Sequence, residues 1–95
     1  EGVLGGHSLV ADVAVIGVPN DEYGEEVKAV IVPQDGVAAD EDLVGTLRSF
    51  CREQLASFKV PRSFDFTDEL PRTGTGKVQK AKVRAPYWEG HDRAI

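Results

Sequence analysis

The chain has 95 residues, of which 41% are hydrophobic and 28% charged, and its formal net charge is −5. This length is typical of one small domain and too short for two. The single cysteine, Cys51, excludes an internal disulfide and a zinc site built on cysteine pairs, so we expect a reducing, cytoplasmic location rather than a disulfide-stabilised secreted scaffold.

The first residues show no targeting signal. Residues 1–7 have neither the basic nor the apolar region of a secretory signal, and the chain contains no methionine. Its opening reads as the middle of a helix, so we expect a fragment of a longer protein. The longest apolar runs, residues 13–18 and 29–32, are far shorter than the ~20 residues that a membrane helix needs, so no membrane span is expected.

The same two apolar runs predict a pair of strands. Both are rich in β-branched residues, and the first ends at Pro19. Residues 20–24 between them form a short polar turn, which favours antiparallel pairing. Glu25 and Glu26 fail as an acid–base pair, because neighbouring side chains on a strand point to opposite faces.

A helix is predicted from Asp40 onward. An apolar stripe with helical spacing follows it, and Asp40 can cap the free N–H groups of the first turn. The stripe consists of Leu43, Leu47, Phe50, Cys51 and Leu55. Residues 62–67 alternate like a third strand, and residues 79–85 predict a short terminal helix that Pro86 closes. The expected fold class is α+β, a small three-stranded sheet with helices packed on it.

Charge is distributed unevenly along the chain. Residues 1–46 carry a net charge of −9, whereas residues 47–95 carry +4. The densest basic stretch contains no acid and comprises Arg72, Lys77, Lys80, Lys82 and Arg84. The overall negative charge and the lack of aromatic residues within this stretch argue against nucleic acid as the partner. A small anion fits better, and a solvated surface is the alternative.

The most distinctive segment is residues 71–77, with the sequence PRTGTGK. Gly74 and Gly76 let the backbone approach an oxyanion, Thr73 and Thr75 offer hydroxyl groups, and Lys77 adds a positive charge on a long side chain. The segment is not a Walker A loop, because Pro71 replaces the first glycine and Val78 the magnesium-binding hydroxyl. A flexible hairpin loop with a solvent-facing lysine is the alternative interpretation.

Other candidate residues carry weaker signals. His7 and His91 lie at opposite ends of the chain without further ligands at suitable spacing, so no metal site is expected. Cys51 lies on the apolar stripe of the predicted helix, where a buried, inert thiol is the natural interpretation. Tyr87 and Trp88 are expected to dock the end of the chain as an apolar plug.

Taken together, four segments resemble the C-terminal domain of the adenylate-forming enzymes. They are residues 10–19 (VADVAVIGVP), 24–32 (GEEVKAVIV), 58–62 (FKVPR) and 70–77 (LPRTGTGK). Within that superfamily the chain most resembles acyl-CoA synthetases, or fatty-acid–CoA ligases. Residues 86–93 (PYWEGHDR) are similar to the ends of bacterial fatty-acid members.

The resemblance implies that residues 1–95 are the mobile C-terminal lid of a larger ligase that also has an N-terminal adenylation domain. That domain would bind the carboxylic acid, ATP and Mg²⁺, and CoA would be the second substrate. Lys77 matches the family's catalytic lysine for adenylation, and residues 72–76 (Arg72, Thr73, Gly74, Thr75 and Gly76) form its loop. The isolated fragment is expected to be inactive.

Two other classes of function stay open on the residues alone. One is a free-standing module that binds CoA or a nucleotide through the basic stretch. The other is a structural or interaction domain whose acidic region, residues 12–42, docks a partner or a second copy of the chain.

Overall fold

The fold is taken from a computed structural model of the chain, which describes residues 2–20, 24–55 and 60–89. Its elements are α1 (Gly2–Gly5), β1 (Val10–Asn20), β2 (Gly24–Pro33), α2 (Glu41–Gln54), β3 (Ser63–Phe66) and α3 (Lys80–Trp88). Part of the predicted polar turn, residues 21–23, lies outside the described residues, as do residues 58 and 59 of the FKVPR segment. Residues 90–93 of the similar tail, including His91, also lie outside them.

The predicted antiparallel pair is confirmed, and both strands are longer than their apolar runs. β1 pairs with β2 from Val10 opposite Pro33 to Asn20 opposite Gly24. The register shifts between Val10 and Asp12, which leaves an irregularity of the β-bulge type at the start of β1.

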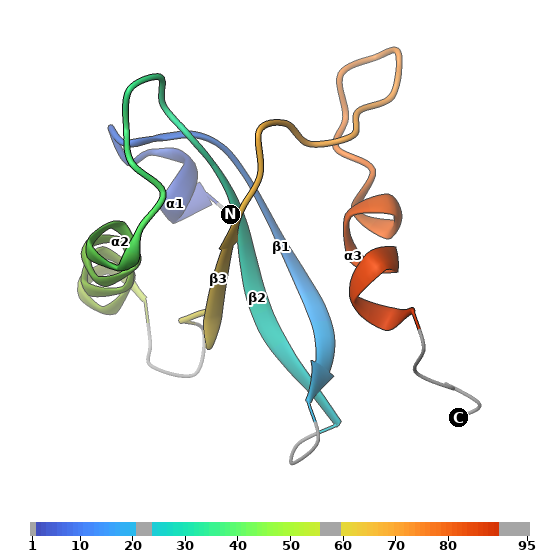
Figure 1. Cartoon of the computed structure of the whole chain (residues 1–95), viewed down its shortest axis with the longest axis horizontal. Coiled ribbons are helices and arrows are strands. Elements are labelled where there is room, and N and C mark those ends of the chain that lie inside the picture. Colours follow the sequence, from blue (N-terminus) through green and yellow to red (C-terminus); the bar gives the residue numbers. More distant parts are fainter. Residues whose placement is uncertain (1, 21–23, 56–59, 90–95) are drawn as a thin grey trace.

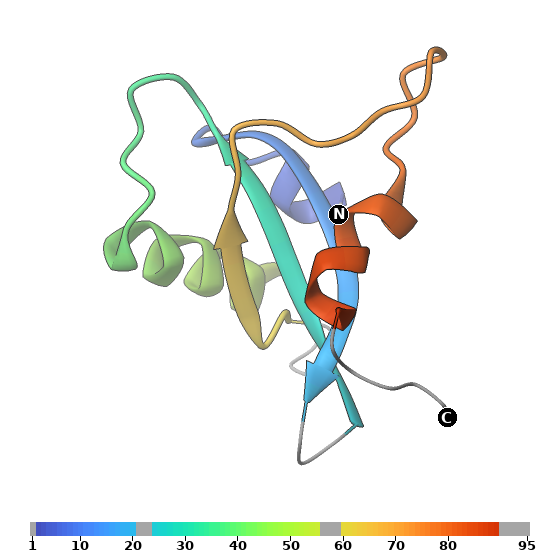
Figure 2. The ribbon, with the colours of Figure 1, turned by 45° about the vertical axis from the view of Figure 1, so that its right-hand side comes forward.

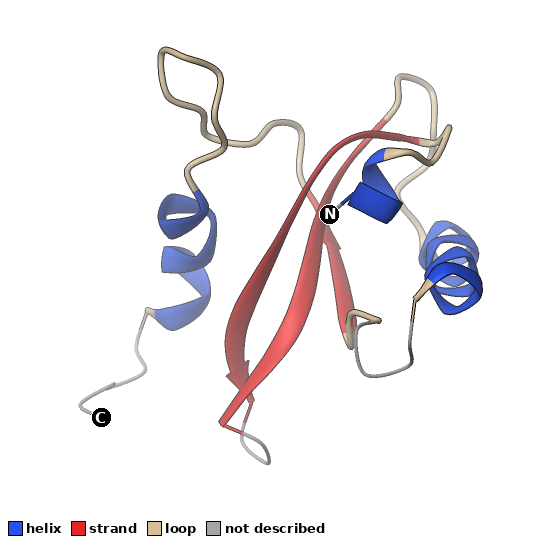
Figure 3. Cartoon of the chain, turned by 180° about the vertical axis from the view of Figure 1, so that it is seen from behind, coloured by secondary structure: helices blue, strands red, loops and turns tan. Residues whose placement is uncertain are grey.

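The third strand is also confirmed, and it lies parallel to β2 in the order β1-β2-β3. The chain reaches β3 through α2, and a helix of this length is what a parallel connection requires. The Asp40 cap is present, because its carboxylate accepts a hydrogen bond of 3.0 Å from the Leu43 amide. The fold is therefore α+β, with helices on both faces of a three-stranded sheet (Figures 1 and 3).

The two faces of the sheet bury separate apolar clusters, because side chains alternate along β1 and β2. Toward α1 and α2 the cluster is built on Val13, Ile31, Leu43, Leu47 and Cys51. Toward α3 it is built on Ala14, Ile16, Val30, Leu70 and Val83. Both clusters contain residues of β1 and β2, so the hairpin of these strands forms the centre of the molecule.

The prediction that Pro86 closes the last helix is wrong. Helix α3 runs from Lys80 to Trp88 and contains Pro86 in its last turn. A proline there removes one helical hydrogen bond, but the residues after it are held by the sheet. The Tyr87 hydroxyl donates to Asp65, and the Trp88 indole N–H donates to the Gly17 carbonyl at 2.9 Å. These contacts dock the end of α3 on the sheet, and Tyr87 also packs against the apolar cluster on that face, whereas the end of the chain that the plug was expected to hold lies outside the described residues.

Candidate functional site

Residues 71–79 form a small hairpin between β3 and α3. Arg72 and Val78 pair as an isolated antiparallel bridge, the Thr73 amide donates to the Lys77 carbonyl at 2.9 Å, and the Gln79 amide donates to Pro71 at 2.9 Å. We call this segment the Lys77 hairpin. It projects from the end of the sheet at which β3 ends, beyond the body of the domain (Figures 1 and 2).

The turn of the Lys77 hairpin is held by its own hydrogen bonds. The Gly76 amide donates to the Thr73 carbonyl at 2.9 Å, and Gly76 has a φ of +91°, a conformation that side chains other than glycine rarely adopt. The Thr73 hydroxyl lies 2.9 Å from that of Thr75 and accepts the Lys77 amide at 3.2 Å. The expected loop is therefore an ordered turn, and both threonine hydroxyls take part in it.

The base of the hairpin is joined to the sheet through Arg72. Its guanidinium group donates one hydrogen bond to the Gly76 carbonyl and forms an ion pair with the carboxylate of Asp12 on β1. The Arg72 side chain is therefore directed toward β1 and the backbone of the hairpin. Sequence reasoning placed Arg72 in the candidate site but missed Asp12, which lies 60 residues away along the chain.

Lys77 is exposed at the end of the hairpin. Its ammonium group has no hydrogen bond or ion pair with any residue that the structure describes, whereas Arg72 beside it has two such partners. A lysine ammonium carries a positive charge at neutral pH. The arrangement thus presents an exposed cation on an ordered turn, where it can meet an anionic group.

Helix α3 continues directly from the hairpin and is anchored to all three strands. Val83 is buried, Tyr87 bonds to Asp65 of β3, and Arg84 pairs with Glu25 of β2 at 3.4 Å. The Arg84 guanidinium also lies 5.5 Å from the centre of the Trp88 ring. Burial, together with the bond to Asp65 and its negative charge, raises the pKa of Tyr87 well above its usual value of 10. Through α3, the C-terminal end of the Lys77 hairpin is thus also fixed to the sheet.

The other residues that the sequence analysis considered make contacts within the domain, away from the Lys77 hairpin. Cys51 lies on the buried face of α2 and is fully buried, and burial raises the pKa of its thiol. The His7 ring packs edge-on against Phe50 at 4.7 Å. Glu25 and Glu26 have separate partners, since Glu26 accepts from Asn20 and Ser63. Within the described ranges, no group of three or more histidine, cysteine or acidic residues could hold a metal ion.

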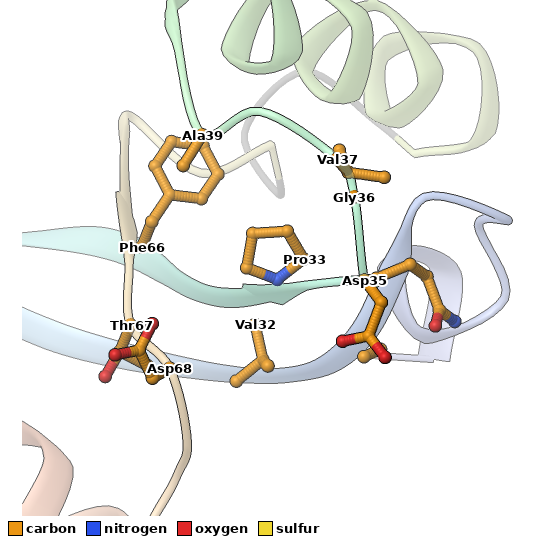
Figure 4. Close-up of a pocket in the computed structure, with 11 residues that line it drawn as sticks. Val32, Pro33, Asp35, Gly36, Val37, Ala39, Phe66, Thr67 and Asp68 are labelled. Carbon is orange, nitrogen blue, oxygen red and sulfur yellow. The ribbon is translucent and has the colours of Figure 1, made fainter.

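A separate cavity of about 790 Å³ lies between the end of β2, the following loop and the end of β3. Figure 4 shows Val32 and Pro33 between Phe66 on one side and the Asp35 carboxylate on the other. Its lining contains no residue of the Lys77 hairpin. The candidate site is therefore an exposed projection and not a cavity of this domain.

No helix in the described part of the chain is long and apolar enough to cross a membrane.

The fold and the site together define a small α+β domain that presents Lys77 on a projecting hairpin. The model of the AMP-binding enzyme C-terminal domain matches residues 1–77. The chain belongs to this family, as the sequence resemblance predicted.

Relatives and solved structures agree with this assignment. A feruloyl-CoA synthase of Amycolatopsis is 49% identical over 92% of this chain, and a medium/long-chain-fatty-acid–CoA ligase of Mycobacterium tuberculosis is 36% identical over all of it. In both comparisons the matched region is 17% of the relative's length. The crystal structure of an acyl-CoA synthetase of Brucella canis matches 94% of this chain with a TM-score of 0.88 and 35% identity, over 16% of that protein.

Proposed function

We propose that the chain is the mobile C-terminal domain of an AMP-forming acyl-CoA ligase and that a preceding N-terminal adenylation domain completes the enzyme. The proposal is supported by the family assignment and by the three relatives named above, a feruloyl-CoA synthase, a fatty-acid–CoA ligase and an acyl-CoA synthetase, of which the chain spans about one sixth. The whole of residues 1–95 then forms a single domain. ATP, Mg²⁺ and the carboxylic acid are bound mainly by the N-terminal domain.

The proposed reaction has two steps. In the first, a carboxylate oxygen of the acid attacks the α-phosphorus of ATP, pyrophosphate leaves, and an acyl-AMP forms. In the second, the CoA sulfur attacks the acyl carbon, the thiol proton is released, and AMP leaves with the bond to the acyl group broken. Both bonds that form are made between groups outside this chain, so its contribution is to place charge.

Lys77 is the proposed catalytic residue of the first step. Its ammonium would lie between the substrate carboxylate and the α-phosphate, where negative charge accumulates as the two groups approach. A cation ~4 Å from such a charge at an effective dielectric constant of ~20 contributes about 4 kcal/mol, or roughly three decades in rate. The observation that carries this role is the exposed Lys77 ammonium, which has no partner in the described structure.

The neighbouring residues have supporting roles in this proposal. Gly74 has open space around its Cβ position, so the turn can approach a nucleotide closely at that point. Gly76 supplies the left-handed backbone that turns Lys77 outward, while Thr73 and Thr75 hold the turn through their hydroxyl groups. When the domain rotates for thioester formation, Lys77 withdraws with the hairpin.

We propose a fatty acid as the natural substrate and the cytoplasm as the location. The first rests on the resemblance of the tail to bacterial fatty-acid members, and the second on the buried, unpaired thiol of Cys51. The relatives named above include one for an aromatic acid and one for fatty acids, so the choice of acid requires a direct assay.

The test is to assay the full-length protein with ATP, Mg²⁺, CoA and separate acids, namely medium-chain and long-chain fatty acids and ferulic acid. The proposal expects acyl-CoA, AMP and pyrophosphate in equal amounts, with a fatty acid as the best substrate. The 95-residue chain alone should form no product. ADP in place of AMP, or thioester formation by the isolated chain, would contradict the proposal, and preference for ferulic acid would contradict the choice of substrate.

A further inference from the structure

Asp12 is joined to the Lys77 hairpin by a chain of contacts that passes through one side chain. The Asp12 carboxylate pairs with the Arg72 guanidinium, and the same guanidinium donates to the carbonyl of Gly76, the residue directly before Lys77. Because a guanidinium group is planar and rigid, it fixes the distance between its two partners. The backbone next to Lys77 is therefore tied to β1.

Asp12 is itself held in one orientation. Its Oδ1 atom accepts a hydrogen bond of 3.0 Å from the Val13 amide, which leaves Oδ2 for Arg72. The irregularity in β1 falls between Val10 and Asp12, and such bulges re-aim the side chains next to them. The Asp12 side chain is 27% exposed and that of Arg72 42%, so the pair is partly exposed. A partly exposed ion pair adds little to the free energy of unfolding of the domain, so its expected effect is local, on the position of the hairpin.

We propose that Asp12 is a positioning residue for Lys77 and acts on it through Arg72. This inference rests on the proposed function, because it gives the fixed hairpin a use in adenylation. The Arg72 guanidinium then serves to brace the hairpin rather than to bind the nucleotide. A catalytic cation must be placed to within about 1 Å, so loosening the hairpin should slow adenylation without removing the charge of Lys77.

The test uses the full-length enzyme and compares Asp12→Ala, Arg72→Ala, the double variant and Asp12→Glu. Two rates are measured at saturating substrates: formation of acyl-AMP, and formation of thioester from supplied acyl-AMP. Asp12→Ala should slow adenylation about tenfold and leave thioester formation unchanged. The double variant should be no slower than Arg72→Ala, since both changes break one connection, and Asp12→Glu should recover most of the rate.

Asp68→Ala is the matched control, because it removes an exposed acid from the segment that leads to the hairpin and breaks no contact of Arg72. It should leave both rates within about twofold of the wild type. An equal effect of Asp68→Ala and Asp12→Ala would overturn the inference, as would equal losses in the two half-reactions or multiplied losses in the double variant.

Hydrogen exchange of residues 72–79 in the full-length enzyme separates this inference from the proposed function. Asp12→Ala should speed exchange of the hairpin amides and Asp12→Glu should restore their protection, whatever Lys77 does in catalysis. If Lys77→Ala adenylates normally, the proposed function fails while the exchange result still decides whether Asp12 orders the hairpin. Unchanged exchange in Asp12→Ala would overturn the inference even if Lys77 proves essential.

Discussion

The Gly76 amide donates a hydrogen bond of 2.9 Å to the Thr73 carbonyl and closes the turn from which Lys77 projects. Gly76 has a φ of +91°, whereas Gly74 has no positive φ and open space at its Cβ position. The backbone at Gly76 therefore requires the conformational freedom of glycine, whereas the backbone at Gly74 does not.

We expect Gly76→Ala to slow adenylation by the full-length enzyme about tenfold, because a side chain in this conformation costs about 1–3 kcal/mol and the turn must shift to relieve it. Gly45→Ala on α2 is the matched control, because an added Cβ there meets open space and the backbone is helical, and it should stay within about twofold of the wild type. The steady-state rate of acyl-AMP formation checks both variants. An undiminished rate in Gly76→Ala, or an equal loss in Gly45→Ala, would contradict the assigned geometry.

Tyr87 gives the domain a specific weakness at alkaline pH. Burial and Asp65 raise the pKa of Tyr87 above the unfolded value of 10, so its contribution to stability is full below pH 10 and is lost as the pH rises further. We expect Tyr87→Phe to lower the free energy of unfolding by about 1–2 kcal/mol at pH 8, through loss of the bond to Asp65.

The difference between wild type and Tyr87→Phe should shrink toward pH 11, since phenylalanine does not ionise. Urea unfolding of the 95-residue chain at several pH values between 8 and 11 measures this difference. A difference that stays constant over that range would show that Tyr87 is not the group responsible.

Glu26 makes the stability of the domain depend on pH in the acidic range, where stability is lost as the pH falls. The hydrogen bonds from Ser63 and Asn20, at 2.7 and 2.6 Å, lower the pKa of Glu26 below the usual 4.5. Its contribution to stability is therefore present above pH 4.5 and is lost as the pH falls through the lowered value. Glu26→Gln should destabilise the chain by about 1–2 kcal/mol at pH 7 and by less at pH 3.

Glu69→Gln is the control for this titration, because the exposed Glu69 side chain makes no hydrogen bond with the described part of the chain. Thermal unfolding at pH 7 and pH 3 compares the two variants. The assignment fails if Glu69→Gln changes the pH dependence as much as Glu26→Gln does.

Elements with a strong local pattern could be predicted from the sequence. The β-branched runs indicated β1 and β2, and the apolar stripe with its Asp40 cap indicated α2, because in each case the chemistry of neighbouring residues decides the structure. The turn at residues 71–77 could also be located, since glycine and proline favour turns over helices and strands.

Features that depend on distant residues could not be predicted. Pro86 would end an isolated helix, but Tyr87 and Trp88 continue α3 because β3 and β1 supply their partners. Likewise nothing near Arg72 in the sequence indicates that Asp12 is its partner, because the ion pair exists only once β1 and the hairpin are side by side. The role of Lys77 remains a prediction, since its target lies outside this chain.

Separate measurement of the two half-reactions in the full-length Lys77→Ala variant tests the central claim most directly. We expect acyl-AMP formation to fall by about 10² to 10³ and thioester formation from supplied acyl-AMP to stay at the wild-type rate. Lys82→Ala, which removes an exposed lysine from α3, should leave both rates unchanged. Equal losses in the two half-reactions of Lys77→Ala, or an undiminished rate of adenylation, would contradict the account.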